Sequence, residues 1–227
     1  TITVLGGYAM TAITAITAQN TLGVSAVEVL SPELVVAQIE ACAADIGVNA
    51  VKIGMLGSAA NAHAVADLLQ DIGIPVVFDP VMVATSGSAL ADPETIVAFE
   101  RLMRIATLVT PNVPELAVLG GDETMAARGV AWLAKGGDAE GPELEDRLVV
   151  PGRDQIIWRA PRIDTRHTHG TGCTLASAIA TCLARGMGLV DAVTTAREFV
   201  RAALLAAPGF GQGHGPLGHQ AVTQSRS

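Results

Sequence analysis

The motif with the most chemical potential is His169-Gly170-Thr171-Gly172-Cys173-Thr174, which opens an alanine-rich segment. Its two glycines allow the backbone to turn so that successive N–H groups point outward, and the start of a helix adds about half a positive charge. Together these features predict an anion site suited to a phosphoryl group. Cys173 could accept a proton from a hydroxyl, because the positive end of a helix stabilises a thiolate. The alternative is a glycine-rich helix cap with a buried cysteine.

A second motif, Thr110-Pro111-Asn112-Val113-Pro114-Glu115, places an amide and a carboxylate three residues apart. Pro114 can open a helix whose first turn contains Glu115. Two such oxygens can hold a hydrated Mg²⁺, which keeps several waters and takes few protein ligands. Asp79 adds a carboxylate directly after an apolar run. The structural alternatives are helix capping by Asn112 and Glu115 and loop capping by Asp79.

Two weaker patterns concern a phosphate chain and an aromatic base. Lys135-Gly136-Gly137 puts a cation beside two small residues, where it could lie along phosphates, although most such sequences are simply turns. Residues 11–24 alternate Ala or Ile with Thr and predict a strand that ends at Gln19-Asn20. The Gln19 amide offers both a donor and an acceptor, as the edge of an aminopyrimidine needs. An ordinary half-buried strand with a polar turn fits the pattern equally well.

The elements that must position these residues alternate between strand-like and helix-like segments. Ser31-Pro32-Glu33 and Asp92-Pro93-Glu94 each combine an N-cap residue with Pro at the first helical position. The strand-like runs are continuously apolar, which is typical of parallel strands buried on both faces. We expect strands over 48–53, 74–78 and 106–109, helices over 32–46, 60–69, 93–104, 172–184 and 189–206, and a hairpin over 147–150 and 155–163.

This alternation predicts an α/β doubly wound fold. In open sheets of this kind, ligands bind in the crevice beyond the carboxyl ends of the strands. Asp79, Asn112 and Met55 each follow a predicted strand, so the polar motifs should gather at that edge.

Composition narrows the class of protein. Half of the 227 residues are hydrophobic but only 3% are aromatic, and no apolar run reaches the ~18 residues that a membrane span needs. The net charge is −8 with scattered Lys and Arg, which argues against a nucleic-acid partner. Cys42, Cys173 and Cys182 form no CxxC pair, and no signal peptide opens the sequence. We therefore expect a cytoplasmic protein without membrane or nucleic-acid partners.

The motifs, taken in order, resemble one known family. TAITAITAQNTLGV, VKIGMLGSA, VVFDPVMVATSGSAL, TLVTPNVPEL, KGG, APRIDTRHTHGTGCTLASAIA and GHGPLGH are similar to the hydroxymethylpyrimidine/phosphomethylpyrimidine kinases. The resemblance implies one ribokinase-like domain over residues 1–227, an α/β fold with a central, mostly parallel sheet flanked by helices and a small β lid. It also implies a homodimer that uses ATP and Mg²⁺ to phosphorylate 4-amino-5-hydroxymethyl-2-methylpyrimidine and then its monophosphate.

The resemblance also assigns roles to residues. Cys173 would be the catalytic base, and the turn from Gly170 to Cys173 would be the anion hole. Gln19 and Met55 would contact the pyrimidine, and Asp79, Asn112 and Glu115 would organise Mg²⁺, partly through water. The catalytic set is Gly170, Thr171, Gly172, Cys173 and Lys135, and the ATP-phosphate set is Asn112, Lys135, Thr168, Gly170 and Gly172.

Two rival functions and two departures from the family pattern stay open. The first rival is a pyridoxal or pyridoxine kinase, which would differ from a pyrimidine kinase only in the ring of its substrate. The second is a non-catalytic pyrimidine- or nucleotide-binding homologue, which would be consistent with the loss of substrate-facing loops. About twenty family residues are missing after Thr1 to Leu5, and no strand is expected before Lys135, because Val130 to Leu133 is taken to continue a helix. Residues 136–150 also look shortened. Either the protein is a shortened homologue or flexible loops are absent from the sequence as written, and the intact motifs favour absent loops.

Overall fold

The computed structural model describes residues 1–84, 87, 89–137 and 141–222. Its centre is a six-stranded sheet in the order β3-β4-β5-β6-β7-β8. The first four strands are parallel, and β7 and β8 continue the sheet antiparallel. The strands are β3 (Val51–Ile53), β4 (Val76–Phe78), β5 (Leu108–Val109), β6 (Trp132–Ala134), β7 (Glu143–Val149) and β8 (Ile156–Pro161). The mostly parallel α/β sheet is therefore confirmed.

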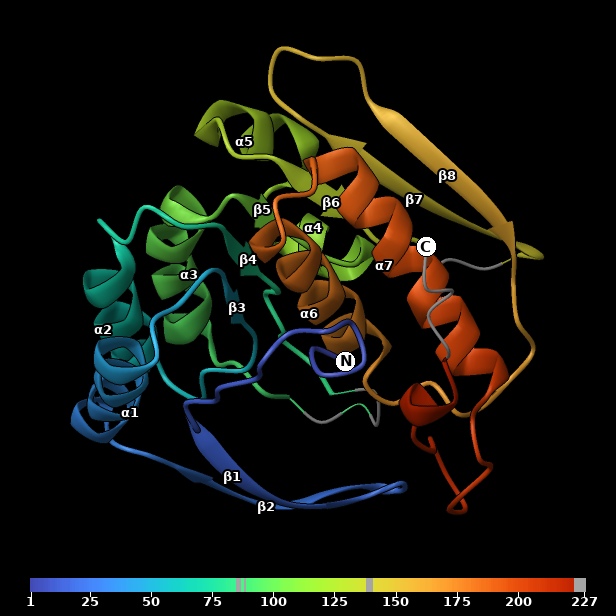
Figure 1. Cartoon of the computed structure of the whole chain (residues 1–227), viewed down its shortest axis with the longest axis horizontal. Coiled ribbons are helices and arrows are strands. Elements are labelled where there is room, and N and C mark those ends of the chain that lie inside the picture. The colour runs from blue at the N-terminus through green and yellow to red at the C-terminus, as the bar shows by residue number, and fades with distance from the viewer. Residues whose placement is uncertain (85–86, 88, 138–140, 223–227) are drawn as a thin grey trace.

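Helices cover both faces of this sheet (Figure 1). One face packs against α6 (Thr171–Ala184) and α7 (Leu189–Leu205), and the other against α2 (Ala59–Leu69) and α3 (Pro93–Ile105), with α1 (Pro32–Asp45) outside α2. Neighbouring strand residues divide between the two cores, because side chains alternate across a strand. Val76 and Phe78 join the core under α2 and α3, while Val77 joins the core under α6 and α7. This division explains the continuously apolar strands.

The expected helix starts are confirmed. The Ser31 hydroxyl accepts the Leu34 N–H at 3.3 Å, and the Asp92 carboxylate accepts the Thr95 N–H at 2.7 Å. Both are N-cap bonds that satisfy a donor left free by the first helical turn. The remaining helices are α4 (Val113–Val118), α5 (Gly121–Arg128) and the 3₁₀ helix η1 (His219–Ala221). Among the described residues, no helix is long and apolar enough to cross a membrane.

A separate hairpin, β1 (Ala15–Asn20) and β2 (Gly23–Val29), lies below the sheet in Figure 1 and forms the small β lid. The buried Asn61 side chain fastens its base, since Nδ2 donates to the carbonyl oxygens of Leu56 at 2.9 Å, Leu30 at 3.2 Å and Thr14 at 3.5 Å. At the tip, the Thr21 carbonyl accepts the His214 N–H at 2.8 Å. The hairpin is thus held at both ends.

One local expectation differs from the structure, and the first five residues form a turn for which no structure was predicted. Val130 to Leu133 do not continue a helix, because α5 ends at Gly129 in a left-handed conformation and Trp132–Ala134 form β6. Thr1 to Leu5 form a turn of helical type, with the Leu5 N–H bonded to the Thr1 carbonyl. Gly6, at φ +80°, ends that turn: its N–H bonds to Thr3 and the Gly7 N–H to Ile2, which is the Schellman pattern.

The positions of any shortened segments stay a prediction. One shortened segment was expected within residues 136–150, and this range includes residues 138–140, which lie outside the described residues.

Candidate active site

The site is built by the two-residue period of the parallel strands. Val77, Leu108 and Leu133 all face the α6 side of the sheet. The residues two positions further along, Asp79, Thr110 and Lys135, therefore point to the same side just beyond the strand ends. Three segments that are far apart in sequence thus place a carboxylate, a hydroxyl and an ammonium together at the carboxyl edge of the sheet.

Lys135 and Asp79 form a buried ion pair. Lys135 Nζ lies 2.7 Å from Asp79 Oδ1, the side chains are 14% and 2% exposed, and the Thr110 hydroxyl donates to the same oxygen at 3.1 Å. Burial alone would raise the pKa of Asp79, but Lys135, followed by Lys52 and the Thr110 hydroxyl, outweighs it and lowers the pKa. Burial would also lower the pKa of Lys135, but Asp79 and Glu115 outweigh it and raise the pKa. Both groups are therefore charged at neutral pH.

Asn112 and Glu115 form a capping box at the start of α4. The Glu115 N–H donates to Asn112 Oδ1 and the Asn112 N–H donates to Glu115 Oε2, both at 2.8 Å. Helix capping, the structural alternative considered for this motif, is thus present. Burial raises the pKa of Glu115 despite the Lys135 ammonium, which lies 3.9 Å from Glu115 Oε2.

A magnesium ion fits this edge only with water or phosphate oxygens completing its shell. Asp79 and Glu115 both approach Lys135, so their carboxylates share one corner of the crevice. Within the described ranges, no group of three acidic, His or Cys side chains is arranged to hold a metal ion. Since Mg²⁺ commonly keeps several waters and binds one or two carboxylates, the donor set suits a hydrated ion.

The amino end of α6 lies directly against the ion pair. Gly170 is the N-cap at φ +83°, a conformation that favours glycine, and no side chain caps this helix end. A Cβ built on Gly172 would lie 3.3 Å from Lys135 Nζ and 3.6 Å from Asp79 Oδ2. The helix dipole and a buried ammonium therefore converge on one place, as an anion site requires. Thr171 begins α6, and the Cys173 side chain is exposed in its first turn.

The C-terminal loop braces this helix end. The Thr168 hydroxyl lies 3.3 Å from His214 Nδ1, and the His169 N–H donates to the Gly215 carbonyl at 3.2 Å. The Thr174 hydroxyl lies 2.9 Å from His219 Nε2. His214 and His219 were not expected as part of the site, although the Gly- and His-rich tail was part of the resemblance. Thr168 is thus placed beside the predicted phosphate turn.

The two predicted pyrimidine contacts lie on the lid side. The Met55 carbonyl accepts the Thr14 hydroxyl at 2.8 Å, which ties the end of β3 to the start of the lid. Met55 and Val27 line a hollow of about 260 Å³ together with residues 89–92. Gln19 lies near the tip of β1, exposed, with its Oε1 3.5 Å from the Thr17 hydroxyl. The structure gathers Asp79, Asn112, Glu115, Lys135 and Gly172, and the contact of Gln19 with the pyrimidine stays a prediction.

Comparison with known proteins shows which family the chain resembles. The model of a family described as phosphomethylpyrimidine kinase matches residues 1–218. A hydroxymethylpyrimidine/phosphomethylpyrimidine kinase from Rhizobium meliloti is 45% identical over 236 residues, covering 96% of this chain and 88% of the relative. That span exceeds the 227 residues of this chain, so the relative has residues opposite gaps in it.

Solved structures resemble most of the chain. The ADP complex of Bacillus subtilis pyridoxal kinase has a TM-score of 0.86 at 29% identity, covering 97% of this chain and 89% of that one. A phosphomethylpyrimidine kinase from Clostridium difficile has a TM-score of 0.74 at 34% identity, covering 88% of each chain.

Fold and site together define the class: a ribokinase-like small-molecule phosphotransferase, with an uncapped helix start at the carboxyl edge of its sheet. Within that class, the chain belongs to the phosphomethylpyrimidine kinase family.

Proposed function

We propose that this protein transfers the γ-phosphoryl group of ATP to the hydroxymethyl group of 4-amino-5-hydroxymethyl-2-methylpyrimidine, and then phosphorylates the resulting monophosphate, in thiamine diphosphate biosynthesis. One observation carries the proposal: the uncapped start of α6 lies against the buried Lys135–Asp79 pair. This arrangement can stabilise charge on a phosphoryl group in transfer. The 45% identity to a named pyrimidine kinase supports the choice of acceptor.

In the proposed reaction, Cys173 Sγ accepts the hydroxyl proton as the alcohol oxygen attacks the γ-phosphorus. The bond from phosphorus to the oxygen shared with the β-phosphate breaks, and ADP leaves. The N–H groups of Gly170, Gly172 and Cys173 hold the equatorial oxygens, while Lys135 neutralises their charge. The Thr171 N–H completes the turn instead, because it bonds to the Thr168 carbonyl at 3.3 Å. Bound Mg²⁺ would shield the phosphates, held by Asp79 and Glu115 partly through water.

The neighbouring backbone gives the donor side of the site its position. The Lys135 N–H bonds to the Pro111 carbonyl at 2.9 Å, so the predicted phosphate residues Asn112 and Lys135 come from adjoining strand ends. Thr168 lies at the turn that leads into α6. We therefore place the ATP phosphates along the ends of β5 and β6, with the acceptor on the lid side.

Pyridoxal kinase activity is the second candidate, because the Bacillus subtilis pyridoxal kinase superposes with the higher TM-score of the two structures compared. Sequence identity favours the pyrimidine kinase, at 34% against 29%. A non-catalytic binding protein is less well supported, because the ion pair, the capping box and the helix turn are all assembled.

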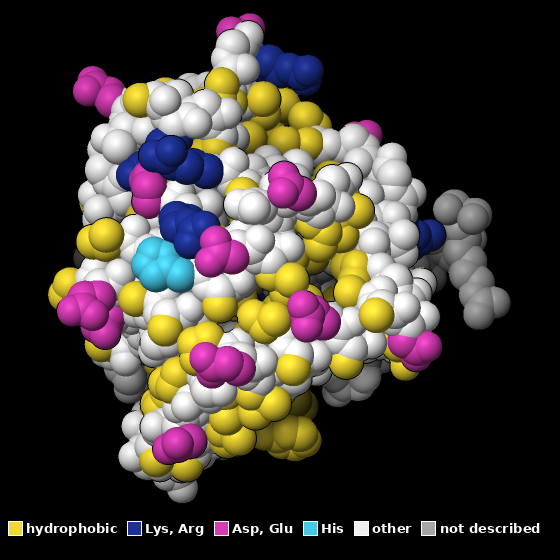
Figure 2. Space-filling view, turned by 90° about the vertical axis from the view of Figure 1, so that its left-hand side faces the viewer, with side chains coloured by type: hydrophobic (Ala, Val, Ile, Leu, Met, Phe, Trp, Pro, Cys, Tyr) yellow, Lys and Arg dark blue, Asp and Glu magenta, His cyan; other side chains and the backbone are white. Residues whose placement is uncertain are grey.

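We also propose that the protein acts as a cytoplasmic homodimer. The lid and α1 expose several large apolar side chains, and Figure 2 shows hydrophobic side chains gathered at the bottom of the molecule, the level at which Figure 1 places the lid. These side chains are Ile16, Leu22, Val27, Val29 and Leu34. Clustered exposed apolar surface is typical of protein interfaces. Light scattering after size exclusion should give twice the 23.2 kDa chain mass.

The catalytic assignment is tested by Cys173→Ala, compared with Cys42→Ala in α1. Loss of a general base costs about 10²- to 10⁴-fold in rate, so Cys173→Ala should lose that much ATP-dependent phosphorylation of the pyrimidine alcohol. Because Cys173 is exposed, its removal should leave the unfolding temperature unchanged. Cys42→Ala should retain the wild-type rate, and full activity of Cys173→Ala would remove the thiol from the mechanism.

A further inference from the structure

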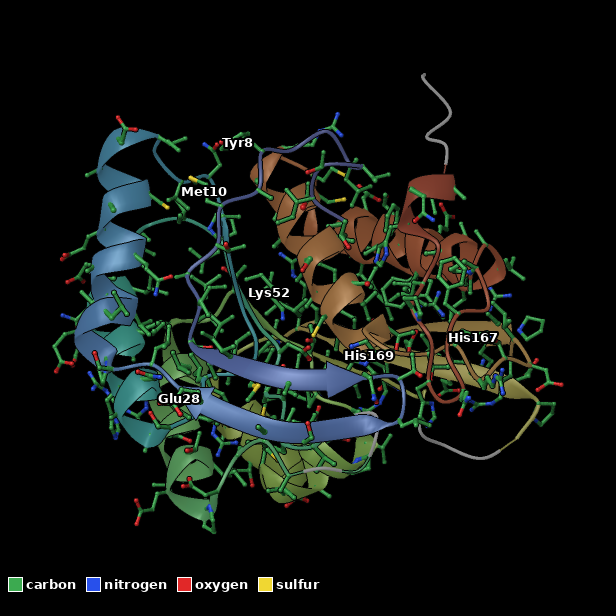
Figure 3. The ribbon with its side chains drawn as sticks, turned by 90° about the horizontal axis from the view of Figure 1, so that it is seen from below. Tyr8, Met10, Glu28, Lys52, His167 and His169 are labelled. Atoms are coloured by element: carbon green, nitrogen blue, oxygen red, sulfur yellow. The ribbon has the colours of Figure 1, made fainter. Side chains whose placement is uncertain are left out.

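Lys52 is a lysine with no assigned role that faces the interior of the site. In β3 it pairs in register with Val77, which belongs to the core under α6 and α7. Its neighbour Ile53 belongs to the opposite core. Lys52 therefore points to the α6 side of the sheet, the same side as Asp79. Figure 3, seen from below, labels Lys52 in the interior between the lid and α6.

The ammonium lies at the carboxyl end of its strand. Position 54 is a glycine, and a Cβ there would overlap Lys52 Nζ, so the side chain runs along the strand toward the crevice. Lys52 is also the second-strongest cation acting on the buried Asp79. The ammonium thus reaches the level of the catalytic ion pair from the neighbouring strand.

Lys52 has no anionic partner of its own. In the part of the chain that the structure describes, no hydrogen bond or ion pair joins it to another residue. Asp79 Oδ1 already lies 2.7 Å from Lys135 Nζ and accepts a hydrogen bond from the Thr110 hydroxyl. A half-buried ammonium gives up part of its hydration, and no protein acceptor among the described residues replaces the lost water. This arrangement suits an ammonium that is completed by an anionic group of a ligand.

The position of β3 indicates which ligand supplies that group. The strand order is β3-β4-β5-β6, so the backbones of Lys52 and Lys135 are three strands apart, about 14 Å at the usual strand spacing, although the Lys135 side chain reaches across to Asp79 at the end of β4. β3 is also the strand that leads to Met55 and, through Thr14, to the lid. Lys52 therefore stands on the acceptor side of the site, away from the strand ends proposed to hold ATP.

We infer that Lys52 is a specificity-determining residue, which binds the phosphate group of the phosphorylated pyrimidine when that monophosphate is the acceptor. This inference rests on the proposed function and deepens it. The alcohol substrate carries no phosphate, so Lys52 should matter for the second phosphorylation and little for the first.

The test compares Lys52→Met and Lys52→Arg with wild type on both acceptors, at saturating ATP. Loss of one charge-assisted bond should lower kcat/KM for the monophosphate by about 10- to 100-fold, mainly through KM. The value for the alcohol should change less than about threefold, and Lys52→Arg should recover part of the loss. Gly54→Ala displaces the ammonium without removing its charge, and should reproduce the same selective loss more weakly.

Equal losses on both acceptors, or none on either, would overturn the inference while leaving the kinase proposal intact. A wild-type protein that phosphorylates neither pyrimidine would instead overturn the proposed function. Calorimetric titration shows whether Lys52 binds a phosphate of the acceptor or a phosphate of ATP, and it requires no turnover. Lys52→Met should weaken binding of the pyrimidine monophosphate and leave a non-hydrolysable ATP analogue within about twofold. If Lys52→Met instead weakened binding of the ATP analogue and left binding of the pyrimidine monophosphate unchanged, Lys52 would bind ATP and the inference would be wrong.

Discussion

Replacing Lys135 by Met should lower the free energy of unfolding, because it breaks the buried ion pair with Asp79. The side chains of Lys135 and Asp79 are 14% and 2% exposed, so the variant leaves a buried carboxylate with only the Thr110 hydroxyl as partner. Breaking a buried pair by removing one member costs about 3–5 kcal/mol. For a chain of this size, each kcal/mol shifts the melting temperature by about 2–4 °C, so we expect a fall of about 6–20 °C.

The same ion pair predicts how the loss of stability in Lys135→Met depends on pH. In wild type the pKa of Asp79 is lowered, so its contribution to stability is present above pH ~3.9 and is lost as pH falls through the folded pKa. Without Lys135, burial is the largest remaining influence and is opposed by Lys52 and the Thr110 hydroxyl, so we expect the pKa to rise above its unfolded value. The variant should then lose stability as pH rises through the raised pKa. Its deficit relative to wild type should therefore be larger at pH 8 than at pH 5.

The assay is urea unfolding at pH 5 and pH 8, with two controls. Arg159→Met breaks the surface pair with Glu145, whose side chains are 60% and 47% exposed, and should cost less than about 1 kcal/mol. The double variant Asp79→Asn/Lys135→Met removes both charges and should recover most of the loss. The reasoning is refuted if Lys135→Met costs no more than Arg159→Met, or if its deficit is the same at both pH values.

Much of this site could be predicted because it follows from strand periodicity. Apolar runs placed Asp79 and Asn112 after strands, and Asp92 and Asn112 do cap helices as their sequence context indicates. The two-residue period then places Asp79 on the same side as Val77 and Lys135 on the same side as Leu133, and the shared core of Val77 and Leu133 brings both to one face.

Other features could not be predicted from the sequence, for physical reasons. Trp132–Ala134 is a three-residue strand within the apolar run 130–134. The run is too short for its periodicity to separate strand from helix, and only pairing with β5 and β7 makes it a strand. The contact between Thr174 and His219 joins residues 45 apart, which no local pattern encodes. Lys52 looked like an ordinary strand residue until its register with Val77 assigned its face.

Two further predictions concern the lid. Asn61→Leu removes the donor that serves three carbonyl groups at the lid base, and should lower the unfolding free energy by about 2–3 kcal/mol in urea titrations; a change under 0.5 kcal/mol would contradict this. Gly213→Ala would place a Cβ against the Thr21 backbone carbonyl, so amide exchange at His214, which bonds to Thr21, should speed up at least tenfold. Gly137→Ala is the matched control, since a Cβ there meets no atom within 4 Å, and equal exchange in both variants would refute the lid contact.

The central claim is that this helix end and ion pair phosphorylate a pyrimidine methanol. Its most direct test is ADP formation by the purified protein with ATP and Mg²⁺, measured in parallel with the hydroxymethylpyrimidine, its monophosphate and pyridoxal, with products identified by mass spectrometry. The account predicts turnover of both pyrimidines, each with a higher kcat/KM than pyridoxal. Preferential turnover of pyridoxal, or no turnover of either pyrimidine, would contradict it.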